Sequence, residues 1–272
     1  MNHIMIDGYY GSESRLDDLK VVNSVLNDIV IKLNLTSIMP PYLLPYNYAK
    51  DSDDDGISAF TLLEGGHITI HTFPHRGCLF VDLLYDGYFD EDKLCSILRS
   101  SFNYSVSDEK RVRTERRFLD TTIDEKKIWR GEKNVNDFGP HIIARIEDVD
   151  ITFEQIFDIL DEMPQKISML PICRPFVAKG EGYVSGIVLI AQSHIAFHYC
   201  VDEKTLFCDL FSCSFYDIYN FTQFLEERFG KFEFMTLIRG SKHENKIVNR
   251  GRKIRQYGKW MRAAQKGDKD GL

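Results

Sequence analysis

Residues 184–213 carry the side chains with the clearest chemical potential in this sequence. Ser193 can act as a nucleophile, His198 as an acid or base and Cys213 as a proton donor, and the last two lie five and twenty positions after the serine. Taken singly, each has an ordinary structural explanation, because a strand serine and histidine often bond each other and cysteine packs as a small apolar side chain. The joint spacing therefore calls for an explanation.

The same residue types recur 127 positions earlier in the chain. Five identities share this offset: Ser58/Ser185, His67/His194, His71/His198, Asp82/Asp209 and Leu83/Leu210. His3-Ile4 and His141-Ile142 recur at a slightly larger offset, as one insertion would produce. The shared offset predicts an internal duplication. The copies differ at two positions, because Gly66 stands in place of Ser193 and Asp86 in place of Cys213.

The elements that must position these residues repeat as well. Alternating and helical apolar patterns predict, in the first copy, strands at 3–7, 57–63, 67–72, 78–84 and 103–106, helices at 16–33 and 90–100, and a Pro/Tyr/Asp-rich loop up to residue 55. In the second copy they predict strands at 141–146, 186–191, 194–199, 205–211 and 232–238, and helices at 153–163 and 216–229. We therefore expect an α/β fold of two β-α-β-β-β-α-β repeats, packed sheet to sheet with the helices outside.

Charge and composition divide the chain into four parts. We expect a first repeat at 1–107, a charged connector at 108–136, a second repeat at 137–239 and a basic tail at 240–272. The tail has ten Lys/Arg against three acids, which leaves a net charge of −14 for the rest. It is typical of a solvated terminus, with a docking or polyanion-binding arm as the alternative.

Composition also excludes several functional classes. With 272 residues, 43% hydrophobic side chains and a net charge of −7, the chain is neither disordered nor a whole-protein nucleic-acid surface. No apolar run approaches the ~20 residues of a membrane span, and the first residues lack a secretory signal pattern. The six cysteines form no CxxC pair. We therefore expect reduced thiols, a cytoplasmic location, no membrane or nucleic-acid partner, and a small-molecule substrate.

The segment from residue 184 to residue 213 resembles a known enzyme family. It reads Val-Ser-Gly-Ile-Val-Leu-Ile-Ala-Gln-Ser-His-Ile-Ala-Phe-His over 184–198, and Asp-Leu-Phe-Ser-Cys over 209–213. This is similar to the S-adenosylmethionine decarboxylase family, particularly its small bacterial and archaeal members. Those enzymes show a VSG motif, an ESH motif, a following histidine and a DVFTCG-like strand end.

The resemblance implies a self-processing, pyruvoyl-dependent decarboxylase. The Ser193 hydroxyl would attack the Gln192 carbonyl, and cleavage would leave residues 1–192 as one chain and a pyruvoyl group at position 193 of the other. That cofactor would form a Schiff base with the substrate amine and take up the charge left by decarboxylation. Cys213 would be the proton donor to the substrate carbon. In this family the reaction supplies the aminopropyl donor for spermidine biosynthesis.

The family also implies that the two copies share one site. In its homodimeric members one protomer gives the pyruvoyl serine and the cysteine, and the other gives the VSG serine and the histidine that assist processing. Here Ser58 and His71 of the first copy would serve Ser193. The mirror site of Gly66 and Asp86 would be inactive, which makes the second-copy residues Ser185 and His198 less important. The chain would act as a monomer of two fused repeats, or as a dimer of these.

Two departures from the family pattern concern processing and substrate. Gln192 replaces the glutamate that usually precedes the cleaved serine, so a negative charge is lost beside the reacting bond. The acid expected after the histidine is Asp202 in the second copy and is absent from the first. We expect Asp202, with Phe176 and Tyr46, to contact substrate. The substrate could instead be arginine or ornithine.

Other functional classes remain as alternatives. An inactive family member could act as a binding or regulatory protein. Metal binding would draw on the histidines at 67, 71, 75, 194 and 198, but their segments read as strands, and we expect no metal. The acidic run of Asp51, Asp53, Asp54 and Asp55 lacks EF-hand spacing and is typical of a solvated loop.

Overall fold

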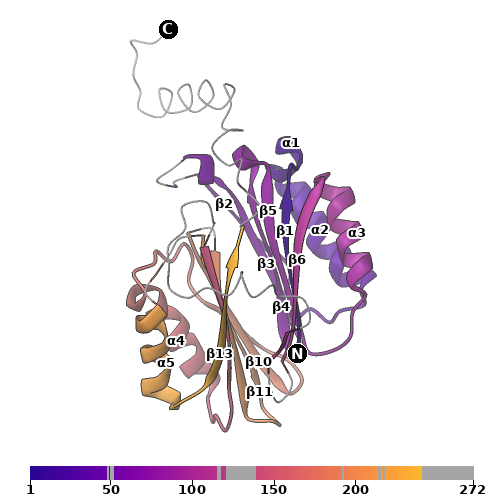
Figure 1. The fold of residues 1–272 in the computed structure, drawn as a ribbon. Coiled ribbons are helices and arrows are strands. Elements are labelled where there is room, and N and C mark those ends of the chain that lie inside the picture. Colours follow the sequence, from indigo (N-terminus) through magenta and orange to yellow (C-terminus); the bar gives the residue numbers. More distant parts are fainter. Residues whose placement is uncertain are drawn as a thin grey trace, which may run out of the picture.

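Two antiparallel sheets form the centre of the molecule. The computed structural model describes residues 1–47, 49, 52–114, 118–120, 139–191, 193–213, 216 and 218–240. Among these residues the two sheets lie face to face, and helices cover the outer face of each (Figure 1). The predicted α/β sandwich of two similar repeats is confirmed.

The first sheet has the strand order β2-β3-β4-β5-β1-β6-β7. Its strands are β1 (Asn2–Tyr9), β2 (Tyr42–Tyr46), β3 (Gly56–Leu63), β4 (Gly66–Phe73), β5 (Cys78–Tyr85), β6 (Val106–Thr114) and β7 (Phe118–Asp120). Its helices are α1 (Glu13–Leu16), α2 (Leu19–Lys32) and α3 (Glu91–Phe102), with 3₁₀ turns at Ser52–Asp54 and Pro74–Arg76.

The second sheet has the order β9-β10-β11-β12-β8-β13, which repeats the first from β2 to β6. Its strands are β8 (Gly139–Ile146), β9 (Phe176–Lys179), β10 (Tyr183–Ile190), β11 (Ser193–Cys200), β12 (Thr205–Phe211) and β13 (Glu233–Arg239). The helices are α4 (Phe153–Lys166) and α5 (Ile218–Phe229). Each helix pair covers one sheet, so the halves meet through their strands (Figure 1).

Strand alternation decides which side chains enter the space between the sheets. Along β4, Ile68 and Ile70 join the apolar core beneath α2 and α3, whereas His67 and His71 face the opposite sheet. The chain therefore has an apolar core under each helix pair and a third layer between the sheets. That middle layer contains most of the buried polar side chains.

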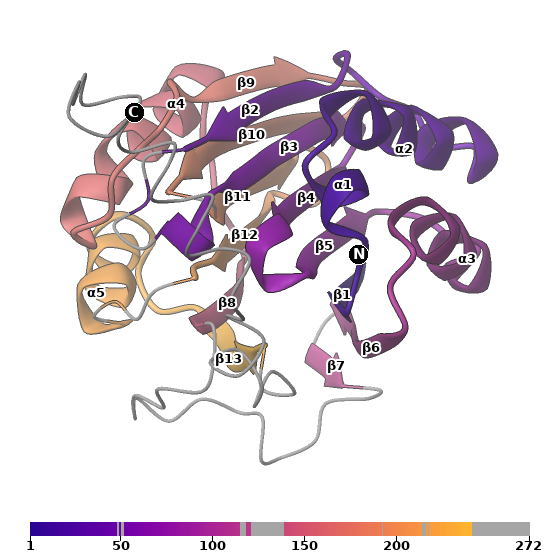
Figure 2. The same ribbon diagram turned by 90° about the horizontal axis from the view of Figure 1, so that it is seen from above.

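Two edge strands were predicted as loops. β2 contains Pro45, and β9 follows directly after Pro175. Proline interrupts a central strand, but an edge strand tolerates it because one row of N–H groups has no ladder partner. β2 and β9 lie side by side at one edge of the sandwich (Figure 2), where the tilted rings of Tyr42 and Phe176 have centroids 4.6 Å apart.

Two element boundaries also differ from the prediction. The stripe at 16–33 breaks into α1 and α2 because Asp18 caps α2, accepting from the backbone N–H groups of Lys20 and Val21. The strand expected at 103–106 is β6, since Asn103 ends α3 in a left-handed conformation (φ 54°) and the strand begins only after the turn. β6 continues to Thr114, into the predicted connector.

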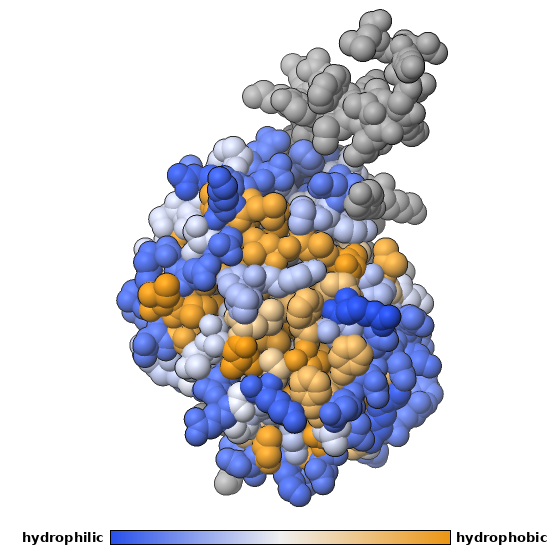
Figure 3. Space-filling view, turned by 180° about the vertical axis from the view of Figure 1, so that it is seen from behind, coloured by the Kyte–Doolittle hydropathy of each residue, from blue (hydrophilic) through white to orange (hydrophobic). Residues whose placement is uncertain are grey.

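The remaining domain predictions lie largely outside the described residues. These are the rest of the connector, except β7, and the basic tail beyond Gly240. Within the described part no helix is long and apolar enough to cross a membrane. Seen from behind, apolar residues gather on the face of the molecule where β2 and β9 meet (Figure 3).

Candidate active site

Ser193 and Cys213 lie in direct contact. Ser193 is the first residue of β11, and its Oγ accepts a hydrogen bond of 2.8 Å from the Cys213 backbone N–H. The Cys213 thiol donates to the Ala191 carbonyl at 3.3 Å. The register explains this contact, because His194 pairs with Phe211 and the chain ends of β11 and β12 therefore meet. The serine is buried and the cysteine half-buried.

Ser58 and His71 from the first half reach the residue next to Ser193. Ser58 Oγ lies 2.9 Å from His71 Nδ1, and His71 Nε2 lies 2.9 Å from His194 Nδ1. Among the described residues, neither Ser58 nor His71 hydrogen-bonds Ser193 itself. Burial lowers the pKa of His71 well below 6.5, so this imidazole is neutral at physiological pH.

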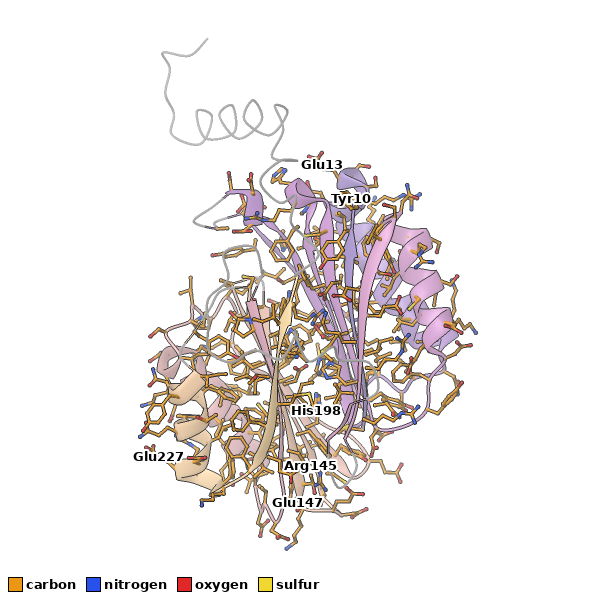
Figure 4. The ribbon with its side chains drawn as sticks, in the orientation of Figure 1. Tyr10, Glu13, Arg145, Glu147, His198 and Glu227 are labelled. Carbon is orange, nitrogen blue, oxygen red and sulfur yellow. The ribbon has the colours of Figure 1, made fainter. Side chains whose placement is uncertain are left out.

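The second half repeats this chain in mirror image. Ser185 Oγ lies 2.9 Å from His198 Nδ1, and His198 Nε2 lies 2.7 Å from His67 Nδ1. Figure 4 shows His198 between the two sheets. Burial lowers its pKa well below 6.5 as well. Each half therefore directs its Ser–His pair toward the other half, and His198 contacts the residue that follows Gly66.

The mirror position is closed to a serine side chain. A Cβ added to Gly66 would lie 2.0 Å from the Leu84 carbonyl oxygen, so the backbone would have to move. Beside it, the Tyr183 hydroxyl donates to Asp86, the counterpart of Cys213. On the Ser193 side the counterpart of Tyr183 is Gly56, where a Cβ would lie 2.0 Å from the Thr72 carbonyl oxygen. A side chain fills this region in one half only.

A larger layer of buried polar side chains surrounds both series of hydrogen-bonded serines and histidines. The sequence pattern did not assign this layer to a site. Its members are fully or almost fully buried: His3, Asp7, His67, Asp82, Lys110, His141, His194, Asp209 and Arg239. The sequence did contain a signal for this layer. Three pairs among its members, His3/His141, His67/His194 and Asp82/Asp209, recur between the repeats, and all its members lie on the strand faces that point to the other sheet.

Two basic side chains compensate two of the three buried carboxylates. Arg239 on β13 pairs with Asp7 and Asp82, and Lys110 on β6 pairs with Asp7 at 3.0 Å. Burial alone would raise the pKa of Asp7, but the charges of Arg239 and Lys110 hold it below 3.8. The third carboxylate, Asp209, is surrounded by imidazoles.

Comparison with known proteins now adds to this geometry. The sequence profile of S-adenosylmethionine decarboxylase matches residues 2–115 and 142–240, most of the chain. The chain belongs to the S-adenosylmethionine decarboxylase family. This is a family of pyruvoyl-dependent carboxy-lyases that bind S-adenosylmethionine.

Individual relatives of the S-adenosylmethionine decarboxylase family are distant. A curated S-adenosylmethionine decarboxylase proenzyme from Archaeoglobus fulgidus is 27% identical over 85 residues, which cover 31% of this chain and 70% of the relative. A crystal structure of the adenosylmethionine decarboxylase from Aquifex aeolicus is 22% identical, with a TM-score of 0.36, over 46% of this chain and 96% of that one. A structure of an unknown protein from Galdieria sulphuraria is 10% identical with a TM-score of 0.20, over 87% and 96% of the two chains.

The residues expected to contact the substrate of an S-adenosylmethionine decarboxylase do not all lie together. Tyr46 ends β2, and burial raises its pKa, with further contributions from Asp55 and Cys213. Asp202 is exposed in the turn that follows β11, a strand that spans roughly 25 Å. Asp202 and Ser193 therefore lie at opposite ends of β11.

Phe176 lies in an apolar cleft at the sandwich edge. Its ring contacts those of Tyr42 and Phe60, with ring centroids 4.6 and 5.3 Å apart respectively. The cleft has a volume of about 370 Å³, and neither Ser193 nor Cys213 lines it.

Gln192 lies outside the described residues. The acidic loop is partly paired, since Asp54 bonds Arg76 and Asp55 accepts from the Ala49 N–H.

Proposed function

We propose that this chain is a self-processing S-adenosylmethionine decarboxylase whose pyruvoyl group derives from Ser193. Its product would be the aminopropyl donor for spermidine synthesis. The observation that carries the proposal is the contact of Ser193 with Cys213, a pair of chemically competent residues at matching strand ends. Family membership supplies the reaction class.

The geometry around Ser193 suits the first processing step. The Cys213 N–H donates to Oγ, so it orients the oxygen while leaving the hydroxyl proton to be given up. As Oγ bonds to the Gln192 carbonyl carbon, the amide becomes an ester, and elimination then leaves residue 192 with a carboxylate and position 193 as dehydroalanine. The imine tautomer of this residue takes up water and releases ammonia, which leaves the pyruvoyl group. Position 193 accommodates a hydroxyl side chain, whereas position 66 does not accommodate even a Cβ.

We further propose that His71 and Ser58 assist this step across the two halves. His71 is neutral and contacts His194, the neighbour of Ser193, and Ser58 orients its other ring nitrogen. A single chain would then contain both partners that a homodimeric relative supplies from two protomers. The two similar repeats and the shared offset support an origin by duplication.

The proposed decarboxylation uses Cys213 after processing. A pyruvoyl group at position 193 supplies an electron sink for the charge left when the substrate loses carbon dioxide. The Cys213 thiol donates to the Ala191 carbonyl, so its proton lies beside the peptide that leads to the cleavage point. That place suits the return of a proton to the substrate carbon.

The test is the intact mass of the purified protein and of Ser193→Ala. The wild-type chain of 31.6 kDa should become two pieces of roughly 22 and 9 kDa, the smaller beginning with a pyruvoyl group, whereas Ser193→Ala stays whole. Ser185→Ala is the matched control and should still be cleaved. A wild-type chain that stays whole, with no ester trapped by hydroxylamine, would overturn the proposal.

Carbon dioxide release identifies the substrate of the processed protein. We expect release from S-adenosylmethionine and none above background from arginine or ornithine. Release from either amino acid alone would reassign the substrate, and a cleaved protein inactive on all three would indicate a binding or regulatory role.

A further inference from the structure

Asp209 lies at the centre of four imidazoles that come from four strands and both halves. Its Oδ2 lies 3.1 Å from His67 Nε2, 3.2 Å from His194 Nε2 and 3.8 Å from His3 Nε2. Its Oδ1 contacts His141 Nε2. All five side chains have no exposed surface. The proposed processing step uses none of these contacts with the carboxylate.

The buried charge of Asp209 lacks a permanent partner. Among the described residues no lysine or arginine forms an ion pair with it, because Arg239 pairs with Asp7 and Asp82 instead. Burial of a carboxylate is costly unless a positive charge accompanies it. In this cluster that charge must be a proton on an imidazole or a bound cation.

Two of the histidines have ring nitrogens that point into this cluster and lack a hydrogen bond. His67 Nε2 is such an atom, although it lies only 3.1 Å from Asp209 Oδ2, because the contact does not have hydrogen-bond alignment. Both ring nitrogens of His3 also lack a hydrogen bond among the described residues, although Nε2 lies 3.4 Å from Asp82 Oδ1. A buried polar atom without a partner is destabilising, so these atoms favour the binding of a ligand at this place.

The opposite ring nitrogens of the two nearest histidines are held in place. His67 Nδ1 bonds His198 Nε2, and His194 Nδ1 bonds His71 Nε2. Metal-binding histidines characteristically have their second ring nitrogen fixed in this way, which orients the first nitrogen and sets the tautomer. Here the second nitrogens lead on to serine hydroxyls, which complete each chain.

We propose that His67 Nε2, His194 Nε2 and Asp209 Oδ2 bind one Zn²⁺ ion. His3 Nε2, which lies 3.8 Å from Asp209 Oδ2 and 3.4 Å from Asp82 Oδ1, would turn from Asp82 toward the ion as the fourth ligand. The first three ligand atoms lie within 4.8 Å of one another. Tetrahedral zinc with bonds of about 2.0–2.1 Å requires ligand atoms about 3.3 Å apart, and the two contacts to Oδ2 are close to that value. This proposal differs from the expectation of no metal, which rested on strand assignment.

The chemistry and closure of the site favour zinc in a structural role. Three imidazoles and one carboxylate without thiolate suit Zn²⁺, and four protein ligands leave no open position. The ligands come from β1 and β4 of one sheet and β11 and β12 of the other. The ion would therefore join the two halves. His141 would remain on Oδ1 and orient the carboxylate.

The first experiment uses the wild-type chain without a polyhistidine tag. After dialysis against Zn²⁺ and then against metal-free buffer, we expect one zinc per chain, and X-ray absorption showing imidazole nitrogen and oxygen ligands without sulfur. Ser193→Ala should retain the same zinc, which separates this site from the proposed processing. A protein that retains no zinc, or zinc bound through sulfur, would overturn the proposal and leave a protonated imidazole as the partner of Asp209.

The second experiment places the ion. His67→Gln and His3→Gln should each weaken zinc binding by at least ~100-fold, and His198→Gln by ~10–100-fold, because it removes the group that orients His67. The control is the double variant His75→Gln and His243→Gln, which changes two histidines that the proposal does not use and should keep one zinc. Loss of zinc in the control, with full binding in His67→Gln, would contradict the proposal. Circular dichroism without zinc identifies any variant that has not folded.

Discussion

Ser193 and Cys213 meet because two antiparallel strands end at the same place. The contact joins residues twenty positions apart, and the register of β11 with β12 requires it. The same register in the first half brings Gly66 beside Tyr85, the neighbour of Asp86. The two sites therefore differ in side-chain chemistry and not in backbone plan. Substitution of these side chains therefore tests the proposed activity.

We expect Cys213→Ala to separate processing from turnover. The backbone N–H that contacts Ser193 remains, so cleavage should largely persist. Turnover should fall by ~10²–10⁴-fold, the usual contribution of a general acid. Fragment masses and carbon dioxide release from S-adenosylmethionine measure the two effects. Unchanged turnover would remove Cys213 from the proposed mechanism.

A second prediction at this scale compares His71→Ala with His198→Ala. Each change removes one buried imidazole that bonds a serine of its own half and a histidine of the other, so the folding cost should be similar. Only His71 reaches the neighbour of Ser193. His71→Ala should therefore block or slow cleavage, whereas His198→Ala leaves it nearly intact. Cleavage time courses, read with melting temperatures, decide between them, and the reverse pattern would place the site within one repeat.

At the scale of elements, the β3–β4 hairpin has closed the position that faces the active serine in the repeat. Gly66 begins β4 with its Cα against the neighbouring strand β5, close to the Leu84 carbonyl. Position 66 therefore has space only for glycine, and glycine also lacks the hydroxyl that processing would need. The corresponding strand β11 leaves room for Ser193 at the same place.

We expect Gly66→Ser not to create a second cleavage site. A Cβ 2.0 Å from a backbone oxygen forces the strands apart, and overpacking of this kind costs about 1–3 kcal/mol. The change is best made in Ser193→Ala, where no other cleavage is expected. Denaturant unfolding measures the stability loss, and a new fragment of roughly 7 kDa would show that the closed position can still react.

At the scale of the whole molecule, buried ion pairs cross between the sheets. Arg239 on β13 of the second sheet pairs with Asp7 on β1 and Asp82 on β5 of the first. Such pairs add less to stability than their number indicates, but removal of one partner leaves a buried charge uncompensated. The interface is therefore sensitive to the protonation of Asp7.

Stability should fall in acid because of this pairing. The pKa of Asp7 is held below 3.8 in the fold, so its contribution is complete above about pH 4 and is lost as the pH falls through the lowered value. Asp7→Asn should cost about 3–5 kcal/mol at pH 7, since Lys110 and Arg239 lose a partner, and should flatten the acid dependence. Denaturant unfolding between pH 3 and pH 7 measures both effects.

The matched control for Asp7→Asn is Asp28→Asn. Asp28 forms an exposed i,i+4 pair with Lys32 on α2, and exposed pairs of this kind contribute roughly 0–1 kcal/mol. The control should leave the acid dependence unchanged. Equal losses in the two variants would show that the buried pair has no special role.

The sequence by itself determined the central strands, the helices, the repeat and the motif around Ser193. Alternation and helical spacing are local properties, so they survive without knowledge of the fold. The edge strands β2 and β9 were missed because local patterns do not show which strand lies next to a segment. A segment with a proline in it or beside it is then read as a loop. The motif around Ser193 indicated the family because its spacing is unusual.

Only the tertiary structure decided which inward side chains meet. Alternation puts His67 and His71 on one face of their strand and His194 and His198 on one face of theirs. It could not say that each histidine bonds one from the other half. That pairing depends on the offset and rotation of one sheet over the other. The same packing gathers four imidazoles around Asp209, a cluster whose members lie up to 206 residues apart in the chain.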